Sequence, residues 1–244
     1  MKRILSFFFV LMLCLGTFNI HSYAYEQAAL SPQEFTRLQK ESLIDNRISY
    51  EMWLQIVKEN DHLEQALDEN ENFKKVYDGV PYALTSAEIE SGDVIITNST
   101  SSFGLTGHAA IAIDSNEILD IPRPKEPVRT QTVSKFKNEY KKGWIKVYRP
   151  QNSSWGSAAA KWASETYKGS NAVYKITLDV NSTNETYCSK IVFQAYKFGV
   201  GEEAFKDYYH TQGDFTGNDY NINYVIILPY GLPTSLDVDY TNKL

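Results

Sequence analysis

Cys188 combines a reactive side chain with the expected start of a helix, and it is one of two cysteines in the 244-residue chain. The residues that follow it at helical spacing are apolar: Ile191, Val192, Ala195 and Phe198. We expect a helix with Thr186 as its N-cap, Gly199 as its stop and these side chains on its buried face. A thiol in the first turn lies near unpaired backbone N–H groups and the positive end of the helix dipole, which both favour the thiolate. Cys188 is therefore a candidate nucleophile.

Two inert interpretations of Cys188 stay open beside this one. A free cysteine is often a small buried apolar residue. A single cysteine in an exported chain can also serve in an intermolecular disulfide.

The N-terminus has the three parts of an export signal. Lys2 and Arg3 precede an apolar run over 4–18, and residues 22–24 form a small-x-small cleavage site. The run is short for a membrane span, and no later stretch is apolar enough for one. We expect residues 1–24 to be removed together with Cys14, and the mature chain to be secreted or held in the cell envelope. Cys188 is then the only cysteine and has no internal disulfide partner, which favours a reactive thiol.

A thiolate nucleophile requires a base within hydrogen-bond reach, and the base requires a third group that orients it. His108 opens a predicted strand of small and apolar residues, and a strand positions a side chain more precisely than a loop does. His62 lies on the charged side of a predicted helix, and His210 lies in an irregular Tyr-rich stretch. We therefore predict that His108 is the base.

Asp120 can orient His108 in one register of the hairpin that follows. A turn centred on Asp114 places Asp120 opposite His108 on the neighbouring strand. A two-residue turn at 115–116 instead pairs Asp120 with Ile111 and directs its side chain away. Both registers remain open. The alternative carboxylates are Asp114 and Glu117.

The pattern of the chain changes once along its length. Residues 31–78 have amphipathic helical periodicity, and short β-rich runs separated by turn residues follow. We expect strands at 93–97, 108–113, 118–121, 144–148, 173–178 and 222–228, a helix at 154–167, and a flexible loop at 98–107. This organisation predicts an N-terminal helical segment followed by a β-rich part.

Several short motifs together resemble one family of enzymes. In chain order they are Gly92-Asp93-Val94-Ile95-Ile96, Gly107-His108-Ala109-Ala110-Ile111-Ala112-Ile113, Ile118-Leu119-Asp120, Val128-Arg129, Val147-Tyr148-Arg149-Pro150, Tyr187-Cys188-Ser189-Lys190-Ile191-Val192 and the ending from Ile227 to Ser235. They resemble the permuted papain-like cysteine amidases, the YiiX-like branch of the NlpC-type superfamily, over roughly residues 87–236. In that branch the histidine precedes the cysteine, as His108 precedes Cys188 here.

The resemblance implies an α+β fold in which a small antiparallel β-barrel packs on the nucleophile helix. It also implies Cys188 as nucleophile, His108 as base and Asp120 as the third residue. Its extent implies a catalytic domain over 87–244, preceded by a helical extension over 25–86. The substrates that it implies are peptidoglycan stem peptides or small aminoacyl or γ-glutamyl amides.

The leading hypothesis from the sequence is an exported cysteine hydrolase that cleaves an amide bond through a thioester on Cys188. The backbone N–H of Cys188 would share the oxyanion with a nearby side chain such as that of Tyr187. A lipid acyl hydrolase or acyltransferase with the same Cys188 and His108 is one alternative, because the superfamily also resembles lecithin:retinol acyltransferases. A non-catalytic ligand-binding module of the same fold is the other.

Composition limits the partners. The net charge is −6, and removal of Lys2 and Arg3 with the signal makes the exported chain more acidic, which argues against nucleic acid. No HExxH motif, CxxC motif or closely spaced histidine pair is present, so we expect no metal or other cofactor. The expected partner is a small-molecule, peptide or peptidoglycan-derived amide substrate, and we expect no integral membrane segment after signal removal.

Overall fold

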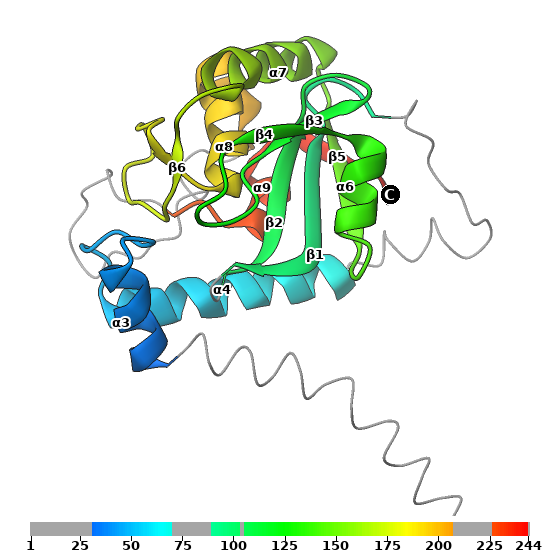
Figure 1. Ribbon diagram of the computed structural model, residues 1–244. Helices are drawn as coiled ribbons and strands as arrows, with labels where there is room; N and C mark the ends of the chain where they lie inside the picture. Colours follow the sequence, from blue (N-terminus) through cyan, green and yellow to red (C-terminus); the bar gives the residue numbers. More distant parts are fainter. Residues whose placement is uncertain (1–30, 70–88, 103–104, 207–225, 244) are drawn as a thin grey trace, which may run out of the picture.

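A six-stranded antiparallel sheet forms the centre of the protein, whose computed structural model describes residues 31–69, 89–102, 105–206 and 226–243 (Figure 1). The strand order is β4-β3-β2-β1-β5-β8. The strands are β1 (Val94–Ser102), β2 (Leu105–Ala112), β3 (Glu117–Asp120), β4 (Arg129–Thr132), β5 (Ile145–Pro150) and β8 (Val238–Lys243). The expected α+β class is confirmed. The expected export signal, residues 1–24, lies outside the described residues.

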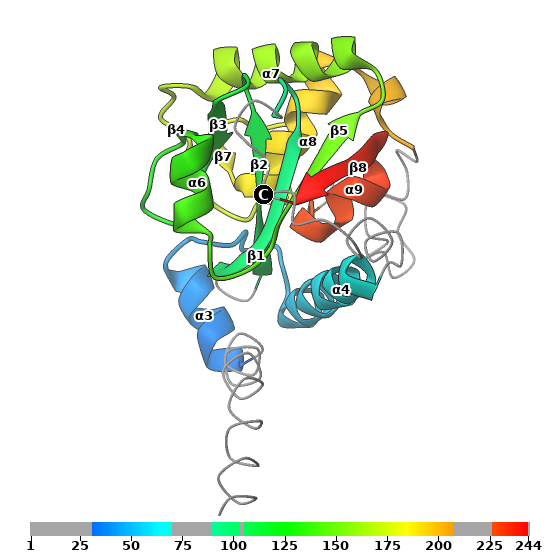
Figure 2. The ribbon, with the colours of Figure 1, turned by 90° about the vertical axis from the view of Figure 1, so that its right-hand side faces the viewer.

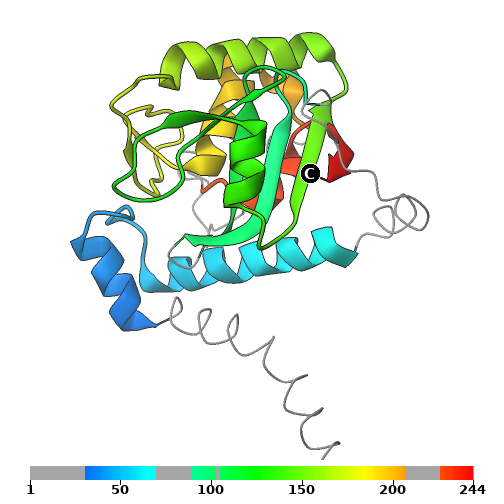
Figure 3. The same cartoon turned by 45° about the vertical axis from the view of Figure 1, so that its right-hand side comes forward.

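Alternating side chains divide the sheet into two packed faces. Val94 and Ile111 point to the face that shares the larger apolar core with α8 (Cys188–Gly199). Ile95 points to the opposite face, where α6 (Val133–Glu139) packs. Figure 3 shows α6 in front of the strands and α8 behind them. Helices therefore cover both faces.

The described strands form an open sheet and not the expected β-barrel. β4 and β8 are its two edges and do not pair with each other. A barrel needs one face that encloses an interior filled by its own side chains, whereas here both faces pack against helices. β4 has only four residues before α6 begins, and α6 turns back over the sheet with Val133 and Phe136 buried. A helix, rather than a closing strand, therefore follows this edge.

The N-terminal helices pack on the same core as α8. They are α3 (Pro32–Lys40) and α4 (Tyr50–Glu69), and α4 crosses one end of the strands. Trp53 of α4 is fully buried in the larger core. The ammonium group of Lys146 on β5 donates a hydrogen bond to the carbonyl oxygen of Leu67 near the end of α4, at 2.9 Å. Apolar and polar contacts thus join this helical segment to the sheet.

α8 begins one residue later than predicted. Its N-cap is Tyr187 and not Thr186, because Thr186 belongs to the short strand β7 (Glu185–Thr186). β7 pairs in parallel with β6 (Val173–Tyr174), which covers only the first part of the strand expected over 173–178.

The C-terminal end of α8 meets α7 (Ser153–Tyr167), which lies at the opposite end of the molecule from α4 (Figure 2). Phe198 is 42% exposed, contrary to the buried position that helical spacing predicts. Its ring centroid lies 5.3 Å from that of Trp162 on α7, so the last turn of α8 packs against a neighbouring helix and not under the sheet.

Short helices complete the described chain: η2 (Glu202–Ala204), η3 (Pro229–Gly231) and α9 (Leu232–Ser235). The strand expected over 222–228 does not form at 226–228, and its first residues lie outside the described part. Among the described helices, none has the length and apolar character needed to cross a membrane.

β1 and β2 are longer than predicted and form a hairpin that leads into His108. β1 continues to Ser102 and β2 begins at Leu105, so most of the loop expected over 98–107 is strand. The hairpin keeps one irregularity of register, between Thr97 and Ser101.

Gly107 is needed at its position for two reasons. Its φ is +88°, in the region that favours glycine, and a Cβ there would lie 2.5 Å from the Tyr230 ring. Gly107 immediately precedes His108 in β2. The close packing of the Tyr230 ring against the Gly107 backbone therefore helps to position His108.

Gly107→Ala is expected to destabilise the fold more than Gly169→Ala, its matched control. Gly169 also has a positive φ, +75°, but a Cβ there would meet nothing within 4 Å. Both variants lose stability because alanine is strained at a positive φ. Only Gly107→Ala adds a steric clash with Tyr230, which should lower the free energy of unfolding by a further amount of about 1–3 kcal/mol. Urea denaturation measures the two free energies of unfolding, and equal losses would contradict this reading.

Candidate active site

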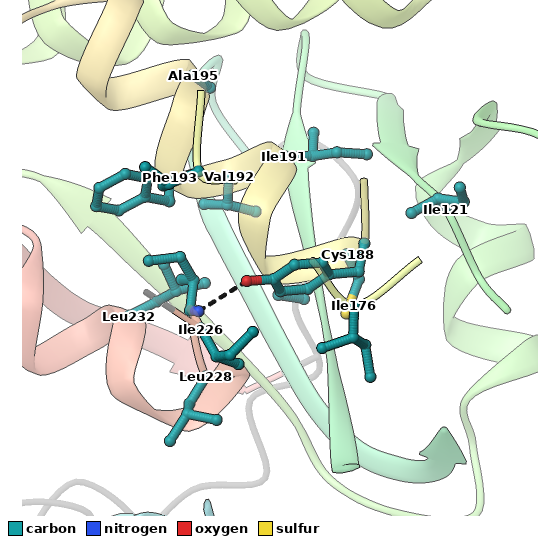
Figure 4. Packing of buried hydrophobic residues seen from close by; sticks show 14 of the residues in the cluster. Ile121, Ile176, Cys188, Ile191, Val192, Phe193, Ala195, Ile226, Leu228 and Leu232 are labelled. Carbon is teal, nitrogen blue, oxygen red and sulfur yellow. Dashed lines mark hydrogen bonds between the residues drawn. The ribbon is translucent and has the colours of Figure 1, made fainter. Parts of the chain in front are cut away.

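Cys188 is the first residue of α8. It is only 4% exposed and lies among apolar side chains that include Ile121 and Ile176 (Figure 4). The N-cap Tyr187 makes no side-chain hydrogen bond to the helix start, so the first-turn N–H groups remain available. The backbone N–H of Ser189 lowers the pKa of the Cys188 thiol.

A second backbone donor comes from the edge of β2. β3 pairs with β2 at Ile111 and Ala112 and ends at Asp120. Beyond this point the edge of β2 faces the start of α8, and the backbone N–H of Ala109 lowers the pKa of the Cys188 thiol. The early end of β3 thus makes room for the thiol beside the strand that carries His108.

His108 is fully buried and holds Asp120 with one ring nitrogen. Its Nε2 lies 2.9 Å from Oδ2 of Asp120, and both side chains have no solvent exposure. Among the described residues, its Nδ1 makes no hydrogen bond of normal geometry. Nδ1 is therefore the nitrogen that remains for the Cys188 thiol, with which the imidazole interacts.

The contact between His108 and Asp120 forms in a register that differs from both alternatives drawn from the sequence. Ala112 lies opposite Ile118, so by the same register Asp120 falls opposite Ala110, two residues from His108. Positions two apart on a strand share a face, and diagonal neighbours lie within reach of long side chains. Both expected registers were wrong, yet the expected contact is present.

The ionisable groups of the site shift one another's pKa. Burial alone lowers the pKa of His108, but its interactions with Asp120 and Cys188 outweigh burial and raise the pKa from 6.5 to about 9. Burial raises the pKa of Cys188, but His108 and the two backbone N–H groups outweigh it and hold this pKa below the ordinary 9.0. Burial also raises the pKa of Asp120, but His108 and Arg129 keep it below 3.8. The folded site therefore favours a thiolate beside an imidazolium.

Side chains from β4 and from the end of α6 contact Asp120 and His108. Arg129 lies directly opposite Asp120 and donates to both of its carboxylate oxygens, at 2.9 and 3.2 Å. The Tyr140 hydroxyl donates to Asp120 at 3.4 Å, and its ring stacks on His108 with centroids 5.1 Å apart.

Sequence reasoning assigned neither Arg129 nor Tyr140 a role. Arg129 offered a signal, because a basic residue can pair with an acidic residue on the neighbouring strand. No sequence signal indicated Tyr140, because it reaches His108 only when α6 packs back over the sheet.

The hydroxyl of Tyr187, the expected second oxyanion donor, faces the C-terminal segment. It accepts a hydrogen bond from the backbone N–H of Ile227 at 2.8 Å. Its described contact thus anchors that segment and is not with the Cys188 sulfur.

The alternative carboxylates do not reach His108. Asp114 is exposed and accepts hydrogen bonds from the backbone N–H groups of Asn116 and Glu117, both at 2.7 Å. Glu117 pairs with Lys168 at 2.8 Å. His62 is exposed, and His210 lies outside the described residues.

No group of three or more His, Cys, Asp and Glu side chains is placed to hold a metal ion among residues 31–69, 89–102, 105–206 and 226–243. A hollow of about 410 Å³ lies at the β2–β3 turn and the start of α7, with Glu90, Asp114 and Arg149 among its lining residues. Neither Cys188 nor His108 lines it.

Comparison with known proteins gives three matches. Residues 63–232 match the family described as "Lipoprotein N-acylation protein LnsA-like". An uncharacterized 30.3 kDa protein of Bacillus thuringiensis is 30% identical in an alignment 237 residues long, and the alignment covers 82% of this chain and 88% of that protein. The crystal structure of metalloprotein yiiX from Escherichia coli O157:H7 is similar with a TM-score of 0.47 and 15% identity, over 64% of this chain and 97% of that one.

The Cys188 thiolate is expected to form at a pH below the ordinary midpoint of 9.0. In a Cys14→Ser chain, where Cys188 is the only cysteine, thiolate absorbance in the ultraviolet measures the midpoint against a chain that also carries Cys188→Ala. His108→Ala should raise the midpoint, because burial is then opposed only by backbone N–H groups. His62→Ala, at an exposed position, should leave it unchanged. A parent midpoint at 9.0 or above, equal in both histidine variants, would show an inert thiol.

Proposed function

The chain belongs to the LnsA-like lipoprotein N-acylation family, and we propose that it is an acyl-transfer enzyme that carries the acyl group as a thioester on Cys188. The observation that carries the proposal is the buried His108–Asp120 pair beside the thiol at the start of α8. A lowered thiol pKa, a base and an orienting carboxylate are the requirements of cysteine nucleophilic catalysis.

Thioester formation begins with attack of the Cys188 thiolate on the carbonyl carbon of an acyl ester. The C–S bond forms while the carbonyl electrons move to oxygen, and backbone N–H groups at the start of α8 stabilise this oxyanion. The intermediate collapses as the bond to the leaving alcohol breaks. That alcohol takes the proton from Nδ1 of the His108 imidazolium, which leaves a thioester, an alcohol and a neutral histidine.

The second half of the reaction returns the enzyme to its starting state. An amine attacks the thioester, His108 accepts the proton that the amine loses, and Cys188 leaves as a thiolate. Asp120 keeps the imidazole oriented throughout, because Nε2 is bound to its carboxylate. The family description names lipoprotein N-acylation, so the proposed acceptor is an amino group of a lipoprotein.

The surroundings of Cys188 support an acyl substrate. Cys188 belongs to the larger cluster of buried apolar residues, which also contains Ile121 and Ile176 (Figure 4). A hydrocarbon chain loses less hydration free energy in such surroundings than a charged peptide does. The cell-wall or small-amide hydrolase suggested by the sequence would use the same thioester, with an amide as donor and water as acceptor.

Two further features are part of this proposal. The order of His108, Asp120 and Cys188 along the chain, with the cysteine at a helix start packed on a sheet, supports the permuted papain-like interpretation. The family supports a place outside the cytoplasm or in the cell envelope, in agreement with the expected signal over residues 1–24.

Acyl-enzyme trapping tests the proposal. The chain is mixed with p-nitrophenyl esters of short and long fatty acids, and the intact mass is measured with and without a peptide that has a free N-terminal amine. We expect an acyl adduct on Cys188 that hydroxylamine removes, that Cys188→Ala abolishes, and that His108→Ala slows by about 100- to 10,000-fold.

The acceptor decides between the enzyme classes. Faster release of the adduct by the amine, with an N-acyl peptide as product, is the expected result. Release by water at a rate that the amine does not change would indicate a hydrolase. A thiol that forms no adduct with any ester would favour a binding module and overturn the proposal.

A further inference from the structure

We propose that Arg129 is a positioning residue that acts through Asp120 and supplies the positive charge that balances the buried thiolate site. The proposal rests on the catalytic pair of the proposed function and adds to it a residue that touches neither the thiol nor the substrate.

Arg129 is placed to hold both the charge and the plane of the Asp120 carboxylate. Its Nε donates to Oδ1 at 2.9 Å and its Nη2 to Oδ2 at 3.2 Å, which is the two-point contact that a guanidinium makes and an ammonium does not. The Arg129 side chain is 22% exposed, whereas that of Asp120 is fully buried. Arg129 therefore neutralises a buried carboxylate while its own guanidinium group keeps partial contact with solvent.

Charge balance requires this residue. In the reactive state Cys188 and Asp120 are negative and His108 is positive, so these three groups alone carry one uncompensated negative charge. An unbalanced charge without water is strongly disfavoured, and such a site would avoid it by protonating the thiolate. Arg129 brings the buried cluster to neutrality.

The other groups that face the cluster do not replace this charge. Burial raises the pKa values of Tyr140 and Tyr187, so both hydroxyls are neutral at the pH values, below 9.0, at which the Cys188 thiol ionises. The backbone N–H groups of Ala109 and Ser189, which also lower the pKa of the Cys188 thiol, are uncharged. On the outer side of Arg129, Glu139 lies 2.8 Å from Nη2 and offsets part of its charge. Glu126 lies farther off, at 3.9 Å from Nη1.

Arg149 offers a matched control. It makes the same two-point contact with the buried carboxylate of Asp93, with Nε–Oδ1 and Nη2–Oδ2 distances of 2.8 Å, and it pairs outward with Glu90 at 2.7 Å. Its loss removes an equivalent buried ion pair that is not connected to His108. A purely structural role of Arg129 predicts the same result for both arginines.

The test is the pH dependence of Cys188 alkylation by iodoacetamide in the full Cys14→Ser chain. We expect Arg129→Gln to move the midpoint of the rate upward by on the order of one pH unit. Arg129→Lys, which keeps the charge, should restore at least half of that shift. Arg149→Gln should leave the midpoint at the parent value.

Glu139→Gln tests the same charge balance with Arg129 in place, and it decides the question if Arg129→Gln does not fold. Removal of the offsetting carboxylate should move the midpoint downward, and a midpoint that stays or rises would overturn the proposal. An Arg129→Gln profile that superimposes on the parent, or an equal shift in Arg149→Gln, would also overturn it. A parent chain without a lowered midpoint would instead refute the proposed function, so the two failures are distinguishable.

Discussion

The burial of opposite charges beside one another is the constraint on which the rest of the structure depends. Cys188, His108 and Asp120 have almost no solvent exposure. A thiolate, an imidazolium and a carboxylate persist in such surroundings only when each has hydrogen bonds and a compensating charge. Two backbone N–H groups favour the ionised form of the Cys188 sulfur, the Asp120 carboxylate binds the His108 imidazole, and Arg129 donates hydrogen bonds to that carboxylate.

The fold meets this constraint by bringing distant segments to one end of β2. β3 stops early enough for the start of α8 to approach the strand edge. The two residues that flank Cys188 are both fixed to Ile227 of the C-terminal segment. The Ser189 hydroxyl donates to its carbonyl oxygen at 2.8 Å, and the Tyr187 hydroxyl accepts from its N–H at 2.8 Å. The direction of the thiol is thereby set by contacts on both sides of the cysteine.

The residue pattern within each segment predicted the helix and the strand that carry the site residues. Contacts between segments determined how these elements are placed relative to one another. The helix at Cys188 and the strand at His108 follow from apolar spacing, which each segment carries by itself. Of the two registers that the sequence left open, the one that placed Asp120 opposite His108 differs from the observed register by two residues, which keeps Asp120 on the same face of the sheet as His108. A shift by one residue would have directed Asp120 to the other side of the sheet.

The features that the sequence did not predict depend on contacts between segments far apart in the chain. The open sheet results from α6 covering a face that a barrel would enclose, and the same helix brings Tyr140 onto the His108 ring. α8 starts one residue later than predicted because Thr186 pairs with Tyr174 of β6. The strand at Tyr174 was predicted, but no local pattern marks residues 185–186 as its partner strand. Acyl transfer, by contrast, was one of the alternatives that the sequence offered, and the match to the LnsA-like family is the reason to propose it ahead of amide hydrolysis.

The protonation state of His108 tests the central claim most directly. Nitrogen NMR of the ring, at pH values between 6.5 and about 9, reports whether both ring nitrogens carry protons. We predict that the imidazolium predominates in the resting enzyme from pH 6.5 upward and is lost only as the pH approaches about 9, with Nδ1 protonated toward the Cys188 thiolate. A ring with one proton across the interval would mean a neutral histidine beside a neutral thiol, and it would contradict the ion pair from which the proposed chemistry starts.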